Sequence, residues 1–215
     1  MSDHTGDSQP DKRIPGAPAG DLSATGAPHP LLERMTGDIQ LMTGERVHVR
    51  PIRPDDTARL QAFHAHLSTD SIVFRFFRYM PTLPEADADH FTHLDYERRM
   101  ALVATADATP ESDLLGVVRY EHDGADTAEV AFVVADHWQG HGIATALLHW
   151  LAPYARMRGV KRFLAVTLGS NAKMLEVLER AGYPHSSRFA DGEYVVTLDI
   201  TAPATEEPAL ADPTP

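Results

Sequence analysis

A loop with two closely spaced glycines is the part of this 215-residue chain best suited to chemistry. It reads Gln139-Gly140-His141-Gly142-Ile143-Ala144 and stands between an apolar run, residues 129–135, and a segment with helical periodicity, residues 142–158. Glycines let the backbone approach a ligand closely, and the first N–H groups of a helix carry partial positive charge and have no partner within the helix. We therefore expect an anion site here, with a phosphate as the natural ligand.

Two better-known phosphate loops differ from this one. The nucleoside-triphosphate loop ends in Gly-Lys followed by Ser or Thr, whereas this chain has Gly142-Ile143-Ala144 at that place. The dinucleotide loop needs three spaced glycines and an acidic residue about 20 residues further on, and that pattern does not fit either. An ordinary tight turn from strand to helix is the alternative explanation of the two glycines.

Metal chemistry and covalent catalysis are not expected from the remaining reactive side chains. The chain has twelve histidines but no cysteine, which excludes disulfides, thiolate metal sites and a cysteine nucleophile. The closest histidine pairs, His64 with His66 and His90 with His93, lack a supporting set of carboxylates. Two residues apart on a helix, His64 and His66 face different directions. We therefore predict no metal site.

The elements that position the loop predict an α+β fold with a central, mostly antiparallel twisted sheet flanked by helices. The run at 129–135 is typical of a strand buried on both faces, and residues 39–50 carry a hairpin signal. Further strands are expected at 101–104, 114–121, 163–168 and 194–200, and helices at about 55–68, 69–78, 85–93, 142–158 and 171–180. One domain is expected at residues 37–201. Residues 1–36 are expected to be a disordered Pro/Gly/Ala-rich tail, and residues 202–215 an acidic Pro-containing tail.

Charge and hydropathy narrow the possible partners. The formal net charge is −12 and the pI is about 5.3, so nucleic acid is not expected as a partner, and a cationic partner is more plausible. No apolar run approaches the roughly 20 residues of a membrane helix, and residues 1–30 lack the pattern of a signal peptide. We expect no membrane partner and a cytoplasmic location.

The loop, as Q-x-x-G-x-A after a strand with an acidic residue near its start, resembles the acetyl-CoA pyrophosphate loop of the GNAT superfamily of N-acetyltransferases. The resemblance extends from Asp38 to Ile200 through IQLMTGERVHVRPIRPDD, DSIVFRFFRYMP, FTHLDYERRMALVA, and AEVAFVVADHWQGHGIATALL followed by NAKMLEVLERAGY. Together these segments are similar to the catalytic domain of the bacterial Pat-type protein lysine acetyltransferases. FRFF and DYERRMALVA are much more specific to that group than the glycine loop is.

The resemblance implies a GNAT-type fold and acetyl-CoA-dependent transfer to the ε-amine of a protein lysine, with an acyl-CoA synthetase as a possible protein substrate. Glu129 matches the family's general base in AEVAF, and the hypothesis includes burial that raises its pKa, or relay through a water. An ion pair between Glu129 and Arg119 on a neighbouring strand is the alternative role. The residues implied to bind the cofactor are Phe132, Val133, Val134, Gln139, Gly140, His141, Gly142, Ile143, Ala144, Thr145, Asn171 and Met174.

Within that set, the backbone at 132–134 is expected to pair with the pantetheine arm, and N–H groups from Gln139 to Thr145 are expected to hold the pyrophosphate. Asn171 is predicted to cap the next helix, to bond the cofactor arm, or both. Leu178 stands where many GNAT enzymes have a tyrosine that protonates the leaving thiolate, so the general acid stays open.

We expect direct attack in a ternary complex, because no cysteine can carry an acyl group. Two alternatives to the protein lysine reading are a small amine, such as a polyamine or an amino sugar, as acceptor, and an acetyl-CoA sensor without turnover.

Overall fold

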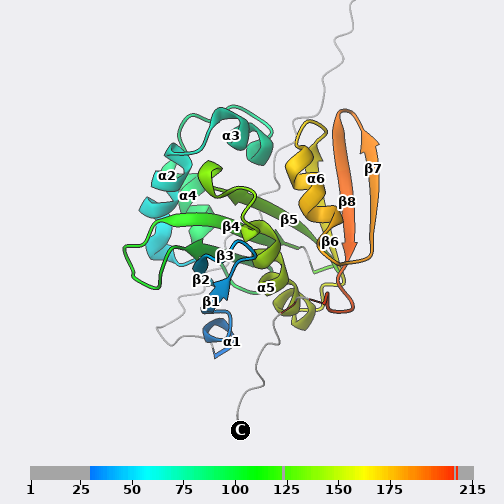
Figure 1. Cartoon of the computed structure of the whole chain (residues 1–215), viewed down its shortest axis with the longest axis horizontal. Helices are drawn as coiled ribbons and strands as arrows, with labels where there is room; N and C mark the ends of the chain where they lie inside the picture. The colour runs from blue at the N-terminus through cyan, green and yellow to red at the C-terminus, as the bar shows by residue number, and fades with distance from the viewer. Residues whose placement is uncertain (1–29, 123, 206, 208–215) are drawn as a thin grey trace, which may run out of the picture.

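The computed structural model describes residues 30–122, 124–205 and 207. These residues contain an eight-stranded sheet in the order β1-β2-β3-β4-β5-β6-β8-β7 (Figure 1). The strands are β1 Gly37–Gln40, β2 Arg46–Pro51, β3 Arg99–Thr105, β4 Leu114–Glu121, β5 Thr127–Val134, β6 Arg162–Leu168, β7 His185–Ala190 and β8 Glu193–Asp199. Neighbouring strands are antiparallel except for β5 and β6, which are parallel. The predicted α+β fold with a mostly antiparallel sheet is confirmed.

Helices cover both faces of the sheet (Figure 1). The α-helices are α1 Pro30–Glu33, α2 Thr57–Ala65, α3 Thr69–Phe76, α4 Glu85–Thr92, α5 Ile143–Met157 and α6 Ala172–Glu179, with short 3-10 turns η1 Pro54–Asp56 and η2 Asp136–Trp138. Helix α5 packs against β3, β4 and β5, and α6 lies beside α5. Helices α2, α3 and α4 gather over the opposite face.

Two hydrophobic cores follow from this arrangement, one on each face of the sheet. Strand β3 shows the division, because Met100 and Leu102 belong to the core under α5 while Ala101 and Val103 belong to the core under α2. All four side chains are fully buried. A strand buried on both faces reads as a continuous apolar run, and β3 has that sequence.

Strand β5 was also expected to be buried on both faces, and that prediction is wrong. Its even-numbered residues, from Ala128 to Val134, pack into the core under α5. On the other face Ala131 and Val133 are only half-buried, and Glu129 is exposed. The apolar run does not reveal this difference, because a cleft rather than a helix lies over the second face.

The parallel pair β5 and β6 diverges soon after it forms. The two strands pair only at Thr127–Glu129 with Arg162–Leu164, although they continue to Val134 and Leu168. From Val130 onward, the edge of β5 that faces β6 therefore has N–H and C=O groups without a strand partner. Such groups are strong hydrogen-bonding sites for an extended ligand.

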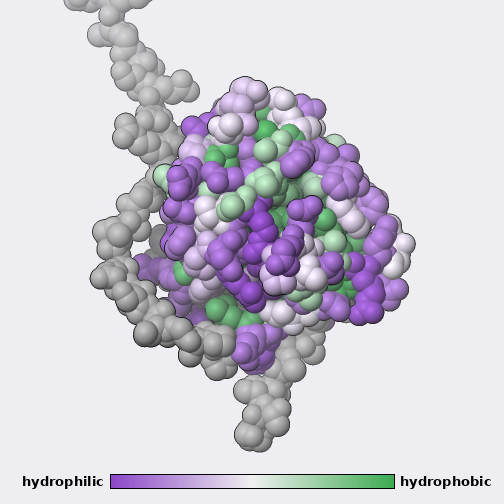
Figure 2. All heavy atoms as spheres, turned by 90° about the vertical axis from the view of Figure 1, so that its left-hand side faces the viewer, coloured by the Kyte–Doolittle hydropathy of each residue, from purple (hydrophilic) through white to green (hydrophobic). Residues whose placement is uncertain are grey.

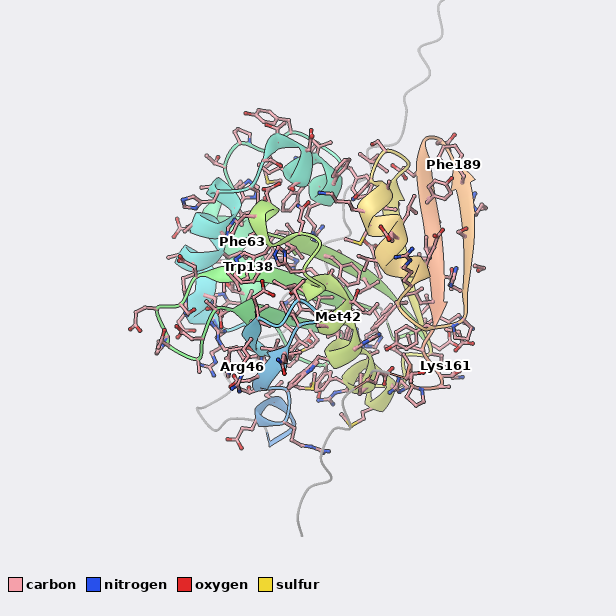
Figure 3. The ribbon with its side chains drawn as sticks, viewed as in Figure 1. Met42, Arg46, Phe63, Trp138, Lys161 and Phe189 are labelled. Atoms are coloured by element: carbon pink, nitrogen blue, oxygen red, sulfur yellow. The ribbon has the colours of Figure 1, made fainter. Side chains whose placement is uncertain are left out.

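Strand β7 was not predicted from the sequence. It pairs with β8 through a two-residue turn in which Asp191 has a φ of 55° and Gly192 a φ of 84°. Positive φ at both turn residues matches the twist of an antiparallel hairpin, and Asp-Gly is a favoured sequence for it. Because β7 is an exposed edge strand, with Phe189 58% exposed (Figure 3), it lacks the apolar pattern of a buried strand.

The folded domain extends beyond both boundaries expected for it. Residues 30–36 were assigned to the N-terminal tail, yet α1 lies there and Met35 is fully buried in the core under α5. Residues from 202 onward were assigned to the C-terminal tail, yet Ala204 is buried. Glu207 accepts hydrogen bonds from Arg156 and Tyr183. The sequence did not reveal these segments, because isolated residues such as Met35, Ala204 and Glu207 form no periodic hydrophobic pattern.

The face over α2, α3 and α4 is mainly polar, with small scattered apolar areas (Figure 2). Within the described part of the chain, none of the helices has both the length and the apolar character needed to span a bilayer.

Candidate active site

A cleft with a volume of about 790 Å³ opens where β5 and β6 diverge. Strand β5 contributes residues 129–134, and β6 contributes residues 165–167. Helices α3 and α6 flank the cleft from opposite sides, and the glycine loop closes one end (Figure 1). The cleft therefore collects side chains from segments up to about a hundred residues apart in the sequence.

Every predicted cofactor-binding residue except His141 lines this cleft. These residues are Phe132, Val133, Val134, Gln139, Gly140, Gly142, Ile143, Ala144, Thr145, Asn171 and Met174. The His141 side chain contacts other groups: its ring centroid lies 5.4 Å from that of Trp138, and its Nε2 lies 3.8 Å from Glu45 in the β1–β2 turn. His141 was expected to contribute its backbone N–H and not its side chain, and that contribution stays a prediction.

The two loop glycines are required by backbone conformation rather than by lack of space. Gly140 has a φ of 82° and Gly142 a φ of 90°, and an added Cβ at either position would meet no atom within 4 Å. Gly142 is the N-cap of α5, and the first full helical bond runs from the Ala146 N–H to the Gly142 carbonyl, at 2.9 Å. The N–H groups of residues 140–145 precede that bond and are available to a ligand.

Gln139 has a different role from the one expected. Its N–H donates to the Asp136 carbonyl at 3.3 Å and is not available to a phosphate. Its side-chain Nε2 donates to the Ser71 hydroxyl at 2.9 Å and to the Val134 carbonyl at 3.3 Å, while its Oε1 accepts from Lys173 at 3.1 Å. Gln139 therefore ties α3, the end of β5 and α6 together around the cleft.

Asp136 completes this network at the end of β5. Its carboxylate accepts from the Ser68 N–H at 2.8 Å, the Ser68 hydroxyl at 2.6 Å and the Ser71 hydroxyl at 2.8 Å. Ser68 is also the N-cap of α3, because its side chain accepts the Ser71 N–H. Partial burial raises the pKa of Asp136, but the hydrogen bonds from Ser68 and Ser71 outweigh it and hold that pKa below its ordinary value. The start of α3 is thus fixed to the strand.

Glu129 lines the cleft near the start of β5 with an exposed side chain. No hydrogen bond or ion pair to it is found among the described residues, so its carboxylate oxygens are free to accept a proton. The expected burial of this carboxylate is not observed. The alternative pairing with Arg119 is also absent: Arg119 lies opposite Ala131 and donates to the Phe91 carbonyl at 2.8 Å.

The residue opposite Glu129 on β4 is Glu121, another exposed carboxylate. Residues directly opposite in an antiparallel pair share a face, and like charges in such a pair destabilise the sheet. Glu129 is therefore placed where it costs stability, a placement expected of a reactive group rather than of a structural one.

Helix α6 and the residues after it match most of the expectations for that segment. Asn171 is the N-cap of α6, since its Oδ1 accepts the Met174 N–H at 3.2 Å. Leu178 is fully buried and does not line the cleft. Tyr183 is 3% exposed and donates to Glu207, so it packs behind α6, as expected, and is not available as a proton donor in the cleft.

Sequence reasoning missed several residues of the cleft. Arg75 on α3 and Lys173 on α6 add positive charge, and the Thr167 hydroxyl is buried there without a hydrogen-bond partner among the described residues. Phe77, which caps α3 with a φ of 56°, is 42% exposed at the cleft. The FRFF block, which contains Arg75 and Phe77, was the only sequence feature that could have indicated them. The position of α3 and α6 beside the cleft results from tertiary packing, which local patterns do not report. The described residues contain no cluster of His, Asp and Glu suited to a metal ion.

Comparison with known proteins identifies the family to which this chain is similar. The family described as an acetyltransferase (GNAT) domain matches residues 46–184. The acetyltransferase Pat of Mycolicibacterium smegmatis is 31% identical over 146 residues, which is 67% of this chain and 43% of that protein. An acetyltransferase of Pseudomonas aeruginosa is 29% identical over 143 residues, 65% of this chain and 76% of that protein. The chain thus spans less than half of the Pat relative.

Solved structures agree with the sequence relatives. The GNAT domain of S. lividans PAT superposes with a TM-score of 0.70 and 39% identity, covering 77% of this chain and 97% of that domain. A cAMP-binding acyltransferase from Mycobacterium smegmatis gives a TM-score of 0.56 and 26% identity, covering 86% of this chain and 52% of that protein.

Proposed function

The chain belongs to the acetyltransferase (GNAT) domain family, and on that premise we propose that it transfers an acetyl group from acetyl-CoA to the ε-amine of a lysine in a protein substrate. One observation carries the proposal. A carboxylate without a protein partner, Glu129, lies in the same cleft as a divergent strand pair and a loop with free N–H groups. Each feature suits one part of the reaction.

Four features of the cleft suit acetyl-CoA. The unpaired edge of β5 from Val130 to Val134 suits the amides of a pantetheine arm, and the N–H groups of residues 140–145 suit a pyrophosphate. Lys173, held by Gln139 beside that loop, adds a positive charge. The buried Thr167 hydroxyl, which has no partner in the described residues, provides a further hydrogen-bonding group.

Glu129 is the proposed general base. A lysine amine with a pKa near 10.4 is almost wholly protonated at pH 7, which costs about 4.6 kcal/mol for the reactive form. Because Glu129 is exposed, we propose that it takes the proton through a water rather than through burial that raises its own basicity. The free amine then attacks the thioester carbonyl and the C–N bond forms. The nitrogen releases its second proton to solvent, the C–S bond breaks, and coenzyme A leaves as the thiolate.

No side chain is assigned to protonate that thiolate. Leu178 and Tyr183 both lie outside the cleft lining, and a thiol is acidic enough to leave as the thiolate. The thiolate therefore takes its proton from solvent.

The acceptor side of the cleft suits a cation with an aliphatic stem. Asp70 and Glu176 are exposed on opposite walls, and the net charge of −12 favours a basic partner. Phe77 presents an exposed ring there in a conformation that costs a non-glycine residue free energy. We propose that this ring packs on the stem of the acceptor lysine, and that an acyl-CoA synthetase is the class of protein that presents the lysine.

The experiment measures thiol release from acetyl-CoA with an acyl-CoA synthetase as acceptor in one reaction and a polyamine in the other. Turnover with the protein acceptor that is lost in Glu129→Gln supports the proposal. Turnover with the polyamine alone would replace it with the small-amine reading. If acetyl-CoA raises the melting temperature but neither acceptor reacts, catalysis of these reactions is refuted and a sensor is the reading left.

A further inference from the structure

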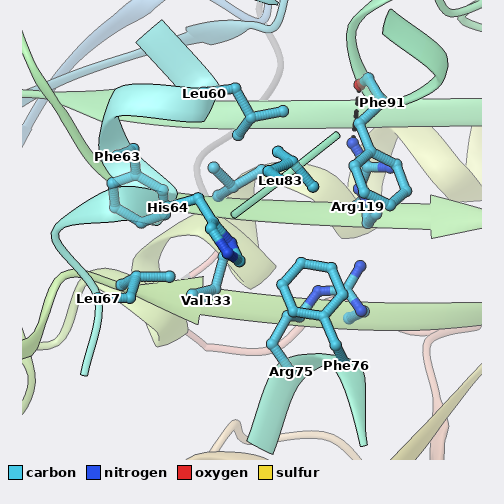
Figure 4. Close-up of a pocket in the computed structure, with 12 residues that line it drawn as sticks. Leu60, Phe63, His64, Leu67, Arg75, Phe76, Leu83, Phe91, Arg119 and Val133 are labelled. Carbon is cyan, nitrogen blue, oxygen red and sulfur yellow. Dashed lines mark hydrogen bonds between the residues drawn. The ribbon is translucent and has the colours of Figure 1, made fainter. Parts of the chain in front are cut away.

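Two arginines line a small cavity under α3, next to the proposed active site (Figure 4). Arg75 comes from α3 and Arg119 from β4. In the close-up Arg75 lies behind the Phe76 ring, and Arg119 lies beside Phe91, to whose carbonyl it donates a hydrogen bond. Apart from His64, whose Nε2 is 2.7 Å from the Met80 carbonyl, the other lining side chains are apolar. The cavity therefore holds two cations in an enclosure that otherwise offers little solvation.

Three other arginines with largely buried side chains are paired with carboxylates. Arg50 binds Asp56 at 2.7 Å, Arg158 lies 3.6 Å from Glu97, and Arg156 binds Glu207. Neither Arg75 nor Arg119 has an ion pair among the described residues. Arg75 lies 5.0 Å from the Phe76 ring centroid, and Arg119 lies 4.3 Å from that of Phe91. Both positive charges have aromatic faces beside them, and the carboxylates near them, Glu129 and Glu121, do not form an ion pair with either.

The ionisation of both groups reflects this environment. Burial lowers the pKa of Arg75, and the Glu129 charge opposes that effect. Burial, followed by the nearby Arg75 charge, lowers the pKa of Arg119 to about 9. Arginine stays protonated in proteins, so a bound anion would relieve the repulsion between the two side chains.

The cavity borders the cleft. Arg75, Ala131 and Val133 line both spaces, and the two β5 residues share a face with Glu129. A group in the cavity would thus lie beside the place where the amine attacks. The cavity volume is about 30 Å³. A single buried water needs roughly 10–15 Å³ of such space, so the cavity has room for a small terminal group.

Resting on the function proposed above, we propose that Arg75 and Arg119 form a subsite for a carboxylate carried by a substrate. An arginine pair matches a carboxylate through charge-assisted, bidentate hydrogen bonds. Because the protein is strongly anionic, a free carboxylate would be repelled, and one tethered to a substrate bound elsewhere would not. The carboxylate has two possible sources: the far end of a dicarboxylic acyl group, such as succinyl, or an acidic side chain next to the acceptor lysine.

The test compares substrates that differ by the carboxylate alone. The first arm measures kcat/KM for succinyl-CoA and acetyl-CoA with one acceptor, and the second uses acetyl-CoA with lysine peptides that carry Glu or Gln beside the lysine. We expect the full chain to prefer the carboxylate by about tenfold in one arm, which identifies its source. Arg75→Gln and Arg119→Gln should each remove most of that preference, and Arg75→Lys should keep part of it.

Arg188→Gln is the matched control, because Arg188 lies on the exposed edge strand β7 and lines neither the cleft nor the cavity. It should leave the preference ratio unchanged. No preference in either arm, or equal losses for both substrates of a pair in Arg75→Gln, would overturn the subsite; equal losses would instead mean that Arg75 positions Glu129.

A binding measurement separates this inference from the proposed function. Calorimetric Kd values for succinyl-CoA and acetyl-CoA need no turnover, and the same values for a pair of Glu and Gln peptides test the acceptor source. An active enzyme with no carboxylate preference refutes the subsite alone. An inactive protein refutes the proposed function, and the Kd ratios and their response to Arg75→Gln then decide the subsite.

Discussion

Strand β5 carries a carboxylate near each end, and the two have opposite surroundings. Asp136, two residues beyond the strand, accepts three hydrogen bonds from Ser68 and Ser71 on α3. Glu129, near the start, has none from the described residues and lies opposite Glu121. One carboxylate is used to hold a helix in place, and the other is left open at the cleft.

The two ends of β5 thus have different roles: one fixes the elements around the cleft, and the other carries the carboxylate that is open to a substrate. At the Asp136 end, hydrogen bonds continue through Ser71 and Gln139 to Lys173, so three elements around the cleft are linked. A site held within narrow geometric limits needs such supporting contacts. At the Glu129 end, the missing contacts leave the oxygens able to exchange protons.

The largest effect is expected for Glu129→Gln. If this carboxylate is the base, kcat should fall by about 10²- to 10⁴-fold, while the Kd for acetyl-CoA stays within about twofold. The melting temperature should not fall, because the substitution removes the repulsion with Glu121. Steady-state kinetics, calorimetry and thermal unfolding measure the three quantities. A kcat within tenfold of the parent would mean that Glu129 is not the base, and its contrast with Asp136 would then have no catalytic meaning.

The next effect concerns the glycine loop that follows the Asp136 end. In Gly142→Val a β-branched residue must adopt a φ near 90°, which costs about 1–2 kcal/mol, or else move the loop. We expect the Kd for acetyl-CoA to rise by about tenfold or more. His141→Ala is the matched control, and its Kd should change by less than about twofold, because that side chain does not line the cleft. A larger effect from His141 than from Gly142 would contradict the backbone-binding reading.

The fold and the glycine loop could be predicted from the sequence because the patterns that indicate them involve residues close together in the chain. Strand-loop-helix periodicity from 129 to 158, the N-cap at Asn171 and the hairpin at 37–51 all depend on neighbouring residues. Edge strand β7 escaped because its exposed residues carry no apolar alternation. Its Asp191-Gly192 turn was the one local signal that would have revealed it.

The parts of the site that were not predicted depend on tertiary contacts. The Gln139 side chain was read as part of a phosphate loop, but its bonds to Ser71 and Lys173 join residues 68 and 34 positions away. The exposure of Glu129 depends on where β5 and β6 stop pairing, which one apolar run cannot report. Arg75 and Arg119 likewise line one cavity only after α3 has packed over the sheet.

A smaller effect is expected for Asp136→Ala. Three hydrogen bonds to the start of α3 are lost, and since the carboxylate is exposed we expect the free energy of unfolding to fall by about 1–2 kcal/mol. The KM for the acceptor should rise by a few-fold while the Kd for acetyl-CoA changes less, because α3 borders the acceptor side. Asp136→Asn keeps an acceptor oxygen and should lie between. Unchanged stability in Asp136→Ala would mean that α3 is held by its apolar packing alone.

The smallest effect is the pH dependence of that stabilisation. Hydrogen bonds from Ser68 and Ser71 hold the pKa of Asp136 below its ordinary value despite partial burial, so the folded state favours the carboxylate. The stabilisation is then fully present above the unfolded pKa, about 3.9, and is lost as the pH falls through the lower folded value. Urea unfolding of the parent and Asp136→Ala, compared from pH 7 down to the lowest pH at which both fold, should show the gap narrowing only below about pH 4. A gap that is constant with pH would mean that the serines bind the carboxyl and carboxylate forms equally, and the contrast with Glu129 would then be one of position and not of charge.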